Sequence, residues 1–169
     1  MRARRIRQII QVVALMVLVA PAMAAIPPPD GPVLLKITGN IRHTNVNDEL
    51  WLDREMLSEL PWHETTTDTP WHRQMGRFEG PLLRSVLELA GVDSDVVEVH
   101  ALNDFFADLP VSDTEDYDVI LAMKRNGREM SIREFGPLFV LYPFDEHPEL
   151  KTEAIQFRSV WQVNLIKVP

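Results

Sequence analysis

The chain has 169 residues, 46% of them hydrophobic, and carries 17 Lys and Arg residues against 25 Asp and Glu residues. This acidic excess disfavours nucleic acid and anionic membranes as partners, because like charges repel. The chain has no cysteine, which excludes disulfides, thiol catalysis, thiolate metal sites and haem attached through thiols. Its length suits one domain that is stabilised by its hydrophobic core alone.

The first 24 residues have the pattern of an export signal. Four arginines lie within residues 2–7, an apolar stretch follows over residues 9–20, and the segment ends in Ala22-Met23-Ala24. The apolar stretch is shorter than the roughly 20 residues that a membrane-spanning helix needs. We therefore expect a signal peptide over residues 1–24, cleaved after Ala24. The mature protein would be periplasmic or secreted, without stable membrane insertion.

A proline-rich leader over residues 25–32 separates this segment from the predicted domain. Pro27, Pro28 and Pro29 prevent a helix there, so the leader should lie extended. The domain is expected to span residues 33–169. Since residues 1–24 hold four of the 17 basic residues and no acidic one, the remainder has 13 basic against 25 acidic side chains, a formal charge of −12.

Two helices are predicted in the first half of the domain. Asp53 can cap a short helix that runs to Leu60 and stops at Pro61. A second helix is predicted from Pro81 to Ala90, because its apolar residues fall on one face and Gly91 follows as a C-terminal cap.

The remaining regular structure is predicted to be mostly β-strands. Asn126-Gly127 favours a tight hairpin turn, because both residues tolerate positive φ angles. The acidic stretch over residues 144–154 is expected to be a surface loop or a short helix. The predicted strands cover residues 33–38, 96–101, 109–111 (ending in a turn at Ser112-Asp113), 119–124, 128–132, 137–142 and 160–168. Strands without regular βαβ spacing predict a single α+β domain, rich in β-structure, with mixed or antiparallel sheets.

Several polar stretches are candidates for a site. Residues 64–72 read ETTTDTPWH, which can be the surface of a strand or the floor of a site. Asn103-Asp104 follows a predicted strand and precedes two phenylalanines, while Arg158 and Trp161 lie at the entrance to the predicted last strand. The five histidines have no metal-binding spacing, and no nucleophile elbow or phosphate loop occurs. No metal ligand or catalytic residue is predicted from these patterns.

The order of several phrases along the chain resembles one known family. These phrases are VLLKITG, ETTTDTPW, RFEGPLLRSVLELAGV, VHALNDFFADLPVSD, VILAMKRNGREMS, GPLFVLYPFD and RSVWQVNLIKV. In that order they resemble the oxidoreductase molybdopterin-binding domain, the sulfite-oxidase type of fold, over about residues 33–168. The resemblance implies a mixed α+β domain in which a pterin dithiolene holds molybdenum and a protein cysteine completes the ligand set.

The resemblance places that cysteine near Thr67 to Thr69, where this chain has none. An oxygen ligand from Asp68 is chemically conceivable but is a poor substitute for a soft thiolate. Two further positions depart from the family. Phe139 stands where an arginine is common, and Val160-Trp161 stands where a Lys-Trp pair is common. No cofactor is therefore expected, and molybdopterin is suggested by the resemblance alone.

We expect a small-ligand-binding or accessory module more than an enzyme. Two alternatives remain open: a molybdopterin-dependent oxidoreductase with a non-cysteine metal ligand, and a structural protein that binds an exported partner. The ligand would be small and polar. The residues expected to meet in a concave site near the strand ends are Thr67, Asp68, Thr69, Trp71, His72, Asn103, Asp104, Arg158 and Trp161.

Overall fold

A computed structural model describes residues 25–169, so the predicted signal peptide lies outside the described residues. Within the described part, no helix has the length and apolar character needed to cross a membrane. The leader is tied to the domain through Gly31, whose amide donates a hydrogen bond of 2.8 Å to the Asp53 carboxylate.

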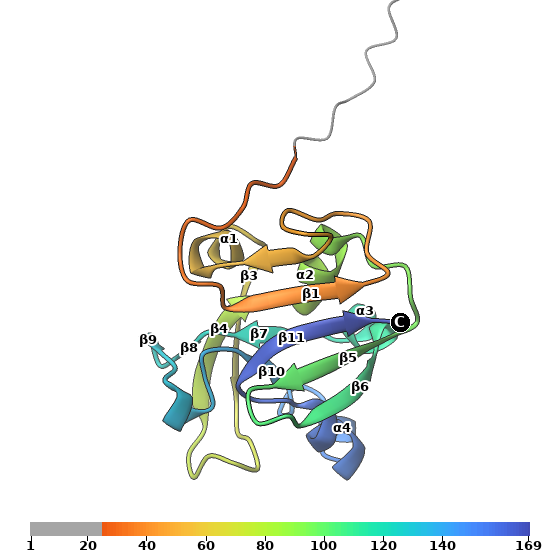
Figure 1. The fold of residues 1–169 in the computed structure, drawn as a ribbon. Coiled ribbons are helices and arrows are strands. Elements are labelled where there is room, and N and C mark those ends of the chain that lie inside the picture. Colours follow the sequence, from red (N-terminus) through yellow and green to blue (C-terminus); the bar gives the residue numbers. More distant parts are fainter. Residues whose placement is uncertain (1–24) are drawn as a thin grey trace, which may run out of the picture.

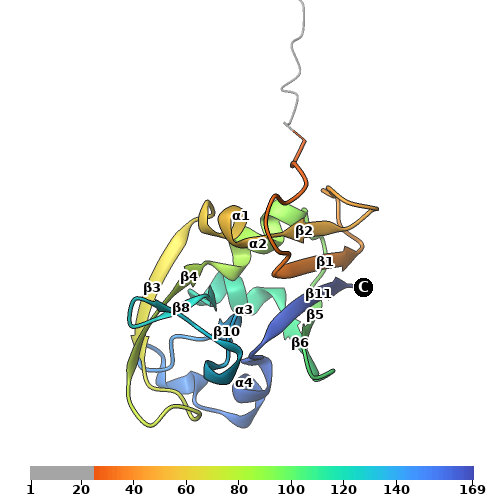
Figure 2. The same cartoon turned by 60° about the vertical axis from the view of Figure 1, so that its left-hand side comes forward.

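The largest sheet has five strands in the order β2-β1-β11-β5-β6. Figure 1 shows β1, β11, β5 and β6 side by side, and Figure 2 labels β2 next to β1. The β1–β11 pair is parallel and the other three pairs are antiparallel, so the sheet is mixed. The last strand of the chain, β11, therefore lies in the middle of the sheet. The five strands are β1 (Leu35–Gly39), β2 (Leu50–Leu52), β5 (Val96–Ala101), β6 (Phe106–Pro110) and β11 (Val163–Val168).

Two further sheets complete the β-structure, and β3 and β4 run together along one side of the molecule (Figure 2). One is an antiparallel four-stranded sheet in the order β3-β4-β8-β9, and the other pairs β7 with β10. A hydrogen bond from the Met123 amide to the Glu79 carbonyl links the end of β7 to β4. The strands are β3 (Trp62–Thr67), β4 (Gly76–Pro81), β7 (Ile120–Ala122), β8 (Lys124–Arg125), β9 (Arg128–Glu129) and β10 (Phe139–Leu141).

The helices are short and lie between the strands in sequence. Of these, α2 packs its buried face into the core, and α4 immediately precedes the turn into β11. The helices are α1 (Arg54–Ser58), α2 (Leu83–Ala90), α3 (Val111–Asp116) and α4 (Glu153–Arg158), with 3-10 turns η1 (Ile132–Glu134) and η2 (Pro148–Leu150).

The core forms where alternating strands meet the apolar face of α2. Leu35 and Ile37 of β1 point inward and are fully buried, as are Leu83 and Val86 of α2. All three residues of β7 and all three of β10 are buried, which explains why these segments are continuously apolar. Each such side chain contributes about 1.5–3 kcal/mol relative to an exposed one, so this core can hold a cysteine-free domain together.

The structure confirms the α+β class and several local predictions. Asp53 caps α1 by accepting a hydrogen bond from the Met56 amide at 3.0 Å. Gly91 ends α2 in the left-handed conformation, with φ of 66°. Asn126 and Gly127 both have positive φ and connect β8 to β9 in the predicted hairpin.

Other boundaries differ from the prediction because tertiary pairing overrides local preference. Pro81 ends β4, where it pairs with Trp62, so α2 begins at Leu83. The stretch from Val111, predicted to finish a strand and turn, forms α3. The predicted strand over 160–168 starts only at Val163, since Gln162 has φ of 55° and interrupts the extended backbone.

Candidate functional site

The stretch ETTTDTPWH divides into a strand and a loop. Its first four residues belong to β3, at the edge of the four-stranded sheet, and alternate between exposed and buried positions. Thr65 and Thr67 point inward and are each 1% exposed, whereas Glu64 and Thr66 face solvent. From Asp68 onward the chain leaves the sheet and forms the loop that leads to β4. The opening part is therefore strand surface, and the chemistry of the loop begins at Asp68.

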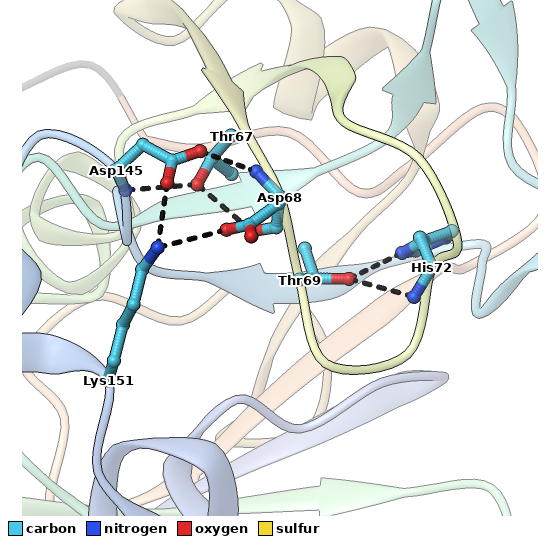
Figure 3. Close-up of polar contacts among 6 residues, drawn as sticks. All are labelled: Thr67, Asp68, Thr69, His72, Asp145 and Lys151. Atoms are coloured by element: carbon cyan, nitrogen blue, oxygen red, sulfur yellow. Dashed lines mark hydrogen bonds and ion pairs between the residues drawn. The ribbon is translucent and has the colours of Figure 1, made fainter.

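A closed polar network holds the start of this loop (Figure 3). The Thr67 hydroxyl accepts from the Asp145 amide at 3.2 Å and donates to the Asp68 carbonyl at 3.0 Å. The Asp145 carboxylate accepts from the Asp68 amide at 2.7 Å and from Lys151 Nζ at 2.8 Å. Lys151 also contacts the Asp68 carboxylate at 3.3 Å. The hydrogen bond from Lys151, with that from the Asp68 amide, lowers the pKa of Asp145 and favours the ionised form of that carboxylate.

Thr69 and His72 form a second, separate contact on the other side of the loop (Figure 3). The Thr69 hydroxyl lies 2.7 Å from His72 Nδ1 and accepts from the His72 amide at 3.2 Å. Burial among aromatic rings, reinforced by the positive charge of Arg125, lowers the pKa of His72. With a neutral imidazole, the hydroxyl donates to Nδ1, and the pair closes the turn between the two residues.

Trp71, which lies between Thr69 and His72 in the sequence, packs in an aromatic cluster. Its ring centroid is 5.6 Å from that of Phe139 and 5.7 Å from that of Trp161, in edge-to-face geometry. Phe139 and Trp161 are also joined by an isolated β-bridge. Trp161, just after α4, is thereby positioned beside the loop of β3 and β4, 90 residues earlier in the chain.

These two indoles line a hollow, named here the aromatic hollow, of about 420 Å³. Asn103 and Phe105 come from the turn between β5 and β6, and the remaining residues come from α4 and the segment after it. The full lining is Trp71, Asn103, Phe105, Glu153, Gln156, Phe157, Ser159, Val160 and Trp161.

A smaller hollow of about 180 Å³ adjoins it, because Gln156 lines both. Its walls include Asp68, Thr69 and Lys151, together with Phe144. Since Lys151 is held by two carboxylates, the charges at this wall are largely compensated.

The other predicted site residues lie elsewhere. Arg158 turns away from the aromatic hollow and donates to the Asp113 carboxylate at 2.9 Å. The same carboxylate accepts from the buried Tyr142 hydroxyl at 2.7 Å, and burial raises the pKa of Tyr142 well above its ordinary value. Asp104 is exposed at the turn after β5, with φ of 66°, and does not line the hollow.

The predicted residues therefore separate into five places, two of which are Arg158 at Asp113 and Asp104 at its exposed turn. Trp71, Asn103 and Trp161 share the aromatic hollow, while Asp68 and Thr69 line the smaller one. Thr67 and His72 hold the loop. From α4 the prediction included only Arg158, and it missed Glu153, Gln156 and Phe157, which line the aromatic hollow. The apolar Ile155 and Phe157 within an otherwise polar stretch were the available signal for this helix.

A comparison with protein-family models agrees with the fold. The family model described as "oxidoreductase molybdopterin binding domain" matches residues 38–144 of the chain. The chain belongs to this family, the sulfite-oxidase type. A search of curated proteins gives no match. The matched range contains β3, β4 and the loop between them that begins at Asp68, whereas α4 and β11 follow it.

The residues at the family's site position do not fit a molybdenum–pterin cofactor. No thiolate is available, and the hydroxyls of Thr67 and Thr69 are engaged by the chain itself. The aromatic hollow has one carboxylate and no cation in its lining, although a phosphate-bearing pterin calls for basic groups. Within residues 25–169, no three His, Asp or Glu side chains gather in a way that could hold a metal ion.

Proposed function

We propose that this protein is an exported small-ligand-binding or accessory module that keeps the family's fold without its molybdenum redox chemistry. The observation that carries the proposal is the aromatic hollow, in which four aromatic side chains surround two amides, a hydroxyl and one carboxylate. Ligand sites commonly combine apolar walls with a few polar groups that orient the ligand. The export part of the proposal rests on the signal-like pattern of residues 1–24.

The engagement of the site-position residues supports the absence of molybdenum chemistry. Asp68, the one oxygen ligand considered for the metal, is paired with Lys151 and would lose that partner on binding molybdenum. Molybdenum bound to a dithiolene favours a soft thiolate as its protein ligand. An enzyme with Asp68 as ligand would therefore have to rebuild the network that anchors the loop.

The test is the molybdenum and pterin content of the protein, purified from its exported compartment in a host that loads other molybdenum enzymes. We expect neither in stoichiometric amount. Stoichiometric molybdenum and pterin would contradict the proposal and favour the oxidoreductase alternative. In that case Asp68→Ala should lower the metal content, while Asp104→Ala, an exposed aspartate outside both hollows, should leave it unchanged.

Binding to another exported protein is a second candidate, because large apolar side chains are exposed near the aromatic hollow. Phe157 is 65% exposed and Phe106 is 55% exposed. Contiguous exposed apolar groups often mark contacts with other molecules. Co-purification of one stoichiometric partner, lost in Phe157→Ser, would favour this role over small-ligand binding.

A further inference from the structure

The aromatic hollow has an unusual balance of charge and aromatic surface. Its walls include Trp71, Phe105, Phe157 and Trp161, and the rings of Trp71 and Trp161 stand at 82° to each other. Both indoles are half-buried, and their edge-to-face contact sets two roughly perpendicular rings side by side in the wall of one hollow. Glu153, at the first turn of α4, is the one ionisable side chain in the lining.

Two of the cations close in sequence to this lining are already compensated. Arg158 is bound to Asp113 at 2.9 Å, and Lys151 is bound to Asp145 at 2.8 Å and to Asp68 at 3.3 Å. Neither is among the residues that line the aromatic hollow. Arg73, two residues after Trp71, is exposed and also lies outside the lining. Within the lining, the charge is therefore that of Glu153, in a chain that is acidic as a whole.

The two other tryptophans show what an indole face attracts in this molecule. The Lys36 ammonium lies 4.3 Å from the ring centroid of Trp51, and that of Lys124 lies 5.7 Å from the ring centroid of Trp62. Attraction of a cation to the negative face of an aromatic ring accounts for such contacts. In the described part of the chain, Trp71 and Trp161 have no comparable lysine or arginine over their rings.

We propose that the aromatic hollow binds an organic ammonium ion, with its alkylated nitrogen against the faces of Trp71 and Trp161 and its charge compensated by Glu153. Asn103 and Gln156 would accept or donate hydrogen bonds to a polar substituent of the ligand. Recognition of alkylated ammonium groups by aromatic rings is an established form of cation–π binding. This inference rests on the proposed ligand-binding function and names the chemical class of its ligand.

The test compares two probes of the same shape that differ in charge. Choline carries a trimethylammonium group, and dimethylbutanol is its uncharged isostere with carbon in place of nitrogen. Binding to the protein spanning residues 25–169 is followed by calorimetry and by the indole N–H signals in NMR spectra. We expect choline to bind at least about tenfold more tightly than dimethylbutanol, as a cation–π contribution with a charge partner implies.

The indole signals of Trp51 and Trp62 are internal controls in the NMR measurement. Choline should shift the indole signals of Trp71 and Trp161, while those of Trp51 and Trp62, already covered by lysines, should stay in place. Uniform small shifts of all four signals, or shifts confined to the latter pair, would overturn the proposed location.

Two substitutions test the roles of the charge and the ring. Glu153→Gln should weaken choline binding about three- to tenfold and leave dimethylbutanol unaffected. Its matched control is Glu55→Gln, an exposed acidic residue at the first turn of α1, which should change neither. Trp161→Leu keeps an apolar, although smaller, side chain and removes the π-face, and should weaken choline binding about tenfold, with a smaller effect on dimethylbutanol.

The outcomes distinguish this inference from the proposed function. Equal binding of choline and dimethylbutanol would overturn the ammonium assignment but leave the hollow as a ligand site. Absence of choline binding into the millimolar range would also overturn it. If a broad panel of neutral, cationic and anionic small molecules also left the Trp71 and Trp161 signals unmoved, the ligand-binding function itself would fail.

Discussion

At the scale of single residues, Asp53 has two structural roles. It is 2% exposed, and its carboxylate accepts from the Met56 amide at the start of α1 and from the Gly31 amide in the leader. These hydrogen bonds lower its pKa. One carboxylate therefore both caps a helix and holds the leader against the domain.

Replacing Asp53 should destabilise the folded protein. We expect Asp53→Ala to lower the free energy of unfolding by about 1–2 kcal/mol, because it removes a helix cap and leaves two half-buried amides without an acceptor. Asp53→Asn keeps one oxygen acceptor, which can still cap α1 through the Met56 amide, but turns an NH2 group toward the Gly31 amide, so it should recover part of the loss. Urea denaturation of the two variants measures the difference, and equal losses in both would refute the capping role.

His72 makes the stability of the protein depend on pH. Because burial lowers its pKa in the folded protein, the unfolded chain takes up a proton more readily. The contribution of neutral His72 is complete above its ordinary pKa of about 6.5 and is lost as the pH falls from there toward the lowered folded value.

His72→Asn tests this dependence, since the asparagine oxygen can still accept from the Thr69 hydroxyl. Wild-type protein should lose unfolding free energy between about pH 7.5 and 5.5, and the variant should lose less over the same interval. Urea titrations at several pH values provide the comparison. Parallel curves for the two proteins would show that His72 is not the titrating group.

At the scale of elements, Asp113 joins three segments that are distant in the sequence. It belongs to α3, and its carboxylate binds the Tyr142 hydroxyl, just after β10, and Arg158, the last residue of α4. Tyr142 is fully buried. This arrangement positions α4, and with it the wall of the aromatic hollow, against the rest of the domain.

Removing Asp113, the shared acceptor, should lower the free energy of unfolding more than removing the Tyr142 hydroxyl, one of its two donors. Asp113→Ala leaves a buried hydroxyl and a partly buried guanidinium unpaired, for an expected loss of about 2–4 kcal/mol. Tyr142→Phe leaves the ion pair of Asp113 with Arg158 intact and should cost about 1 kcal/mol. Chemical denaturation measures both. A larger loss in Tyr142→Phe would contradict the assignment of Asp113 as the joining residue.

At the scale of the whole molecule, folding depends on the end of the chain. Strand β11 pairs with β1 on one side and β5 on the other, although it lies outside residues 38–144 that match the family. Without it, β1 and β5 would each lose a partner and the buried Val163 and Ile166 would be missing from the core.

A truncated protein tests this dependence. Deletion of residues 163–169 should abolish cooperative unfolding, because the five-stranded sheet would be split in two. Deletion of residues 25–29, of similar length at the other end of the described chain, should preserve cooperative unfolding. Thermal and urea unfolding by circular dichroism measures cooperativity, and a cooperative transition in the first variant would refute the central role of β11.

Part of the fold could be predicted from the sequence, because it depends on interactions between residues that are close in the chain. The cap at Asp53, the left-handed end at Gly91 and the turn at Asn126-Gly127 were predictable, because each depends on residues a few positions apart. The α3 segment was not predictable in this way. Val111 favours a strand, and the helix forms where this segment packs beside α2 and β6.

The candidate site shows the same division. The sequence by itself determined that no thiolate can hold molybdenum here, and that Trp71, Asn103 and Trp161 were worth considering together. Only the tertiary structure decided that Arg158 turns to Asp113, that Lys151 engages Asp68, and that α4 supplies Glu153 and Phe157. The physical reason is that charge compensation and cavity walls depend on contacts between residues far apart in the chain, which no local pattern encodes.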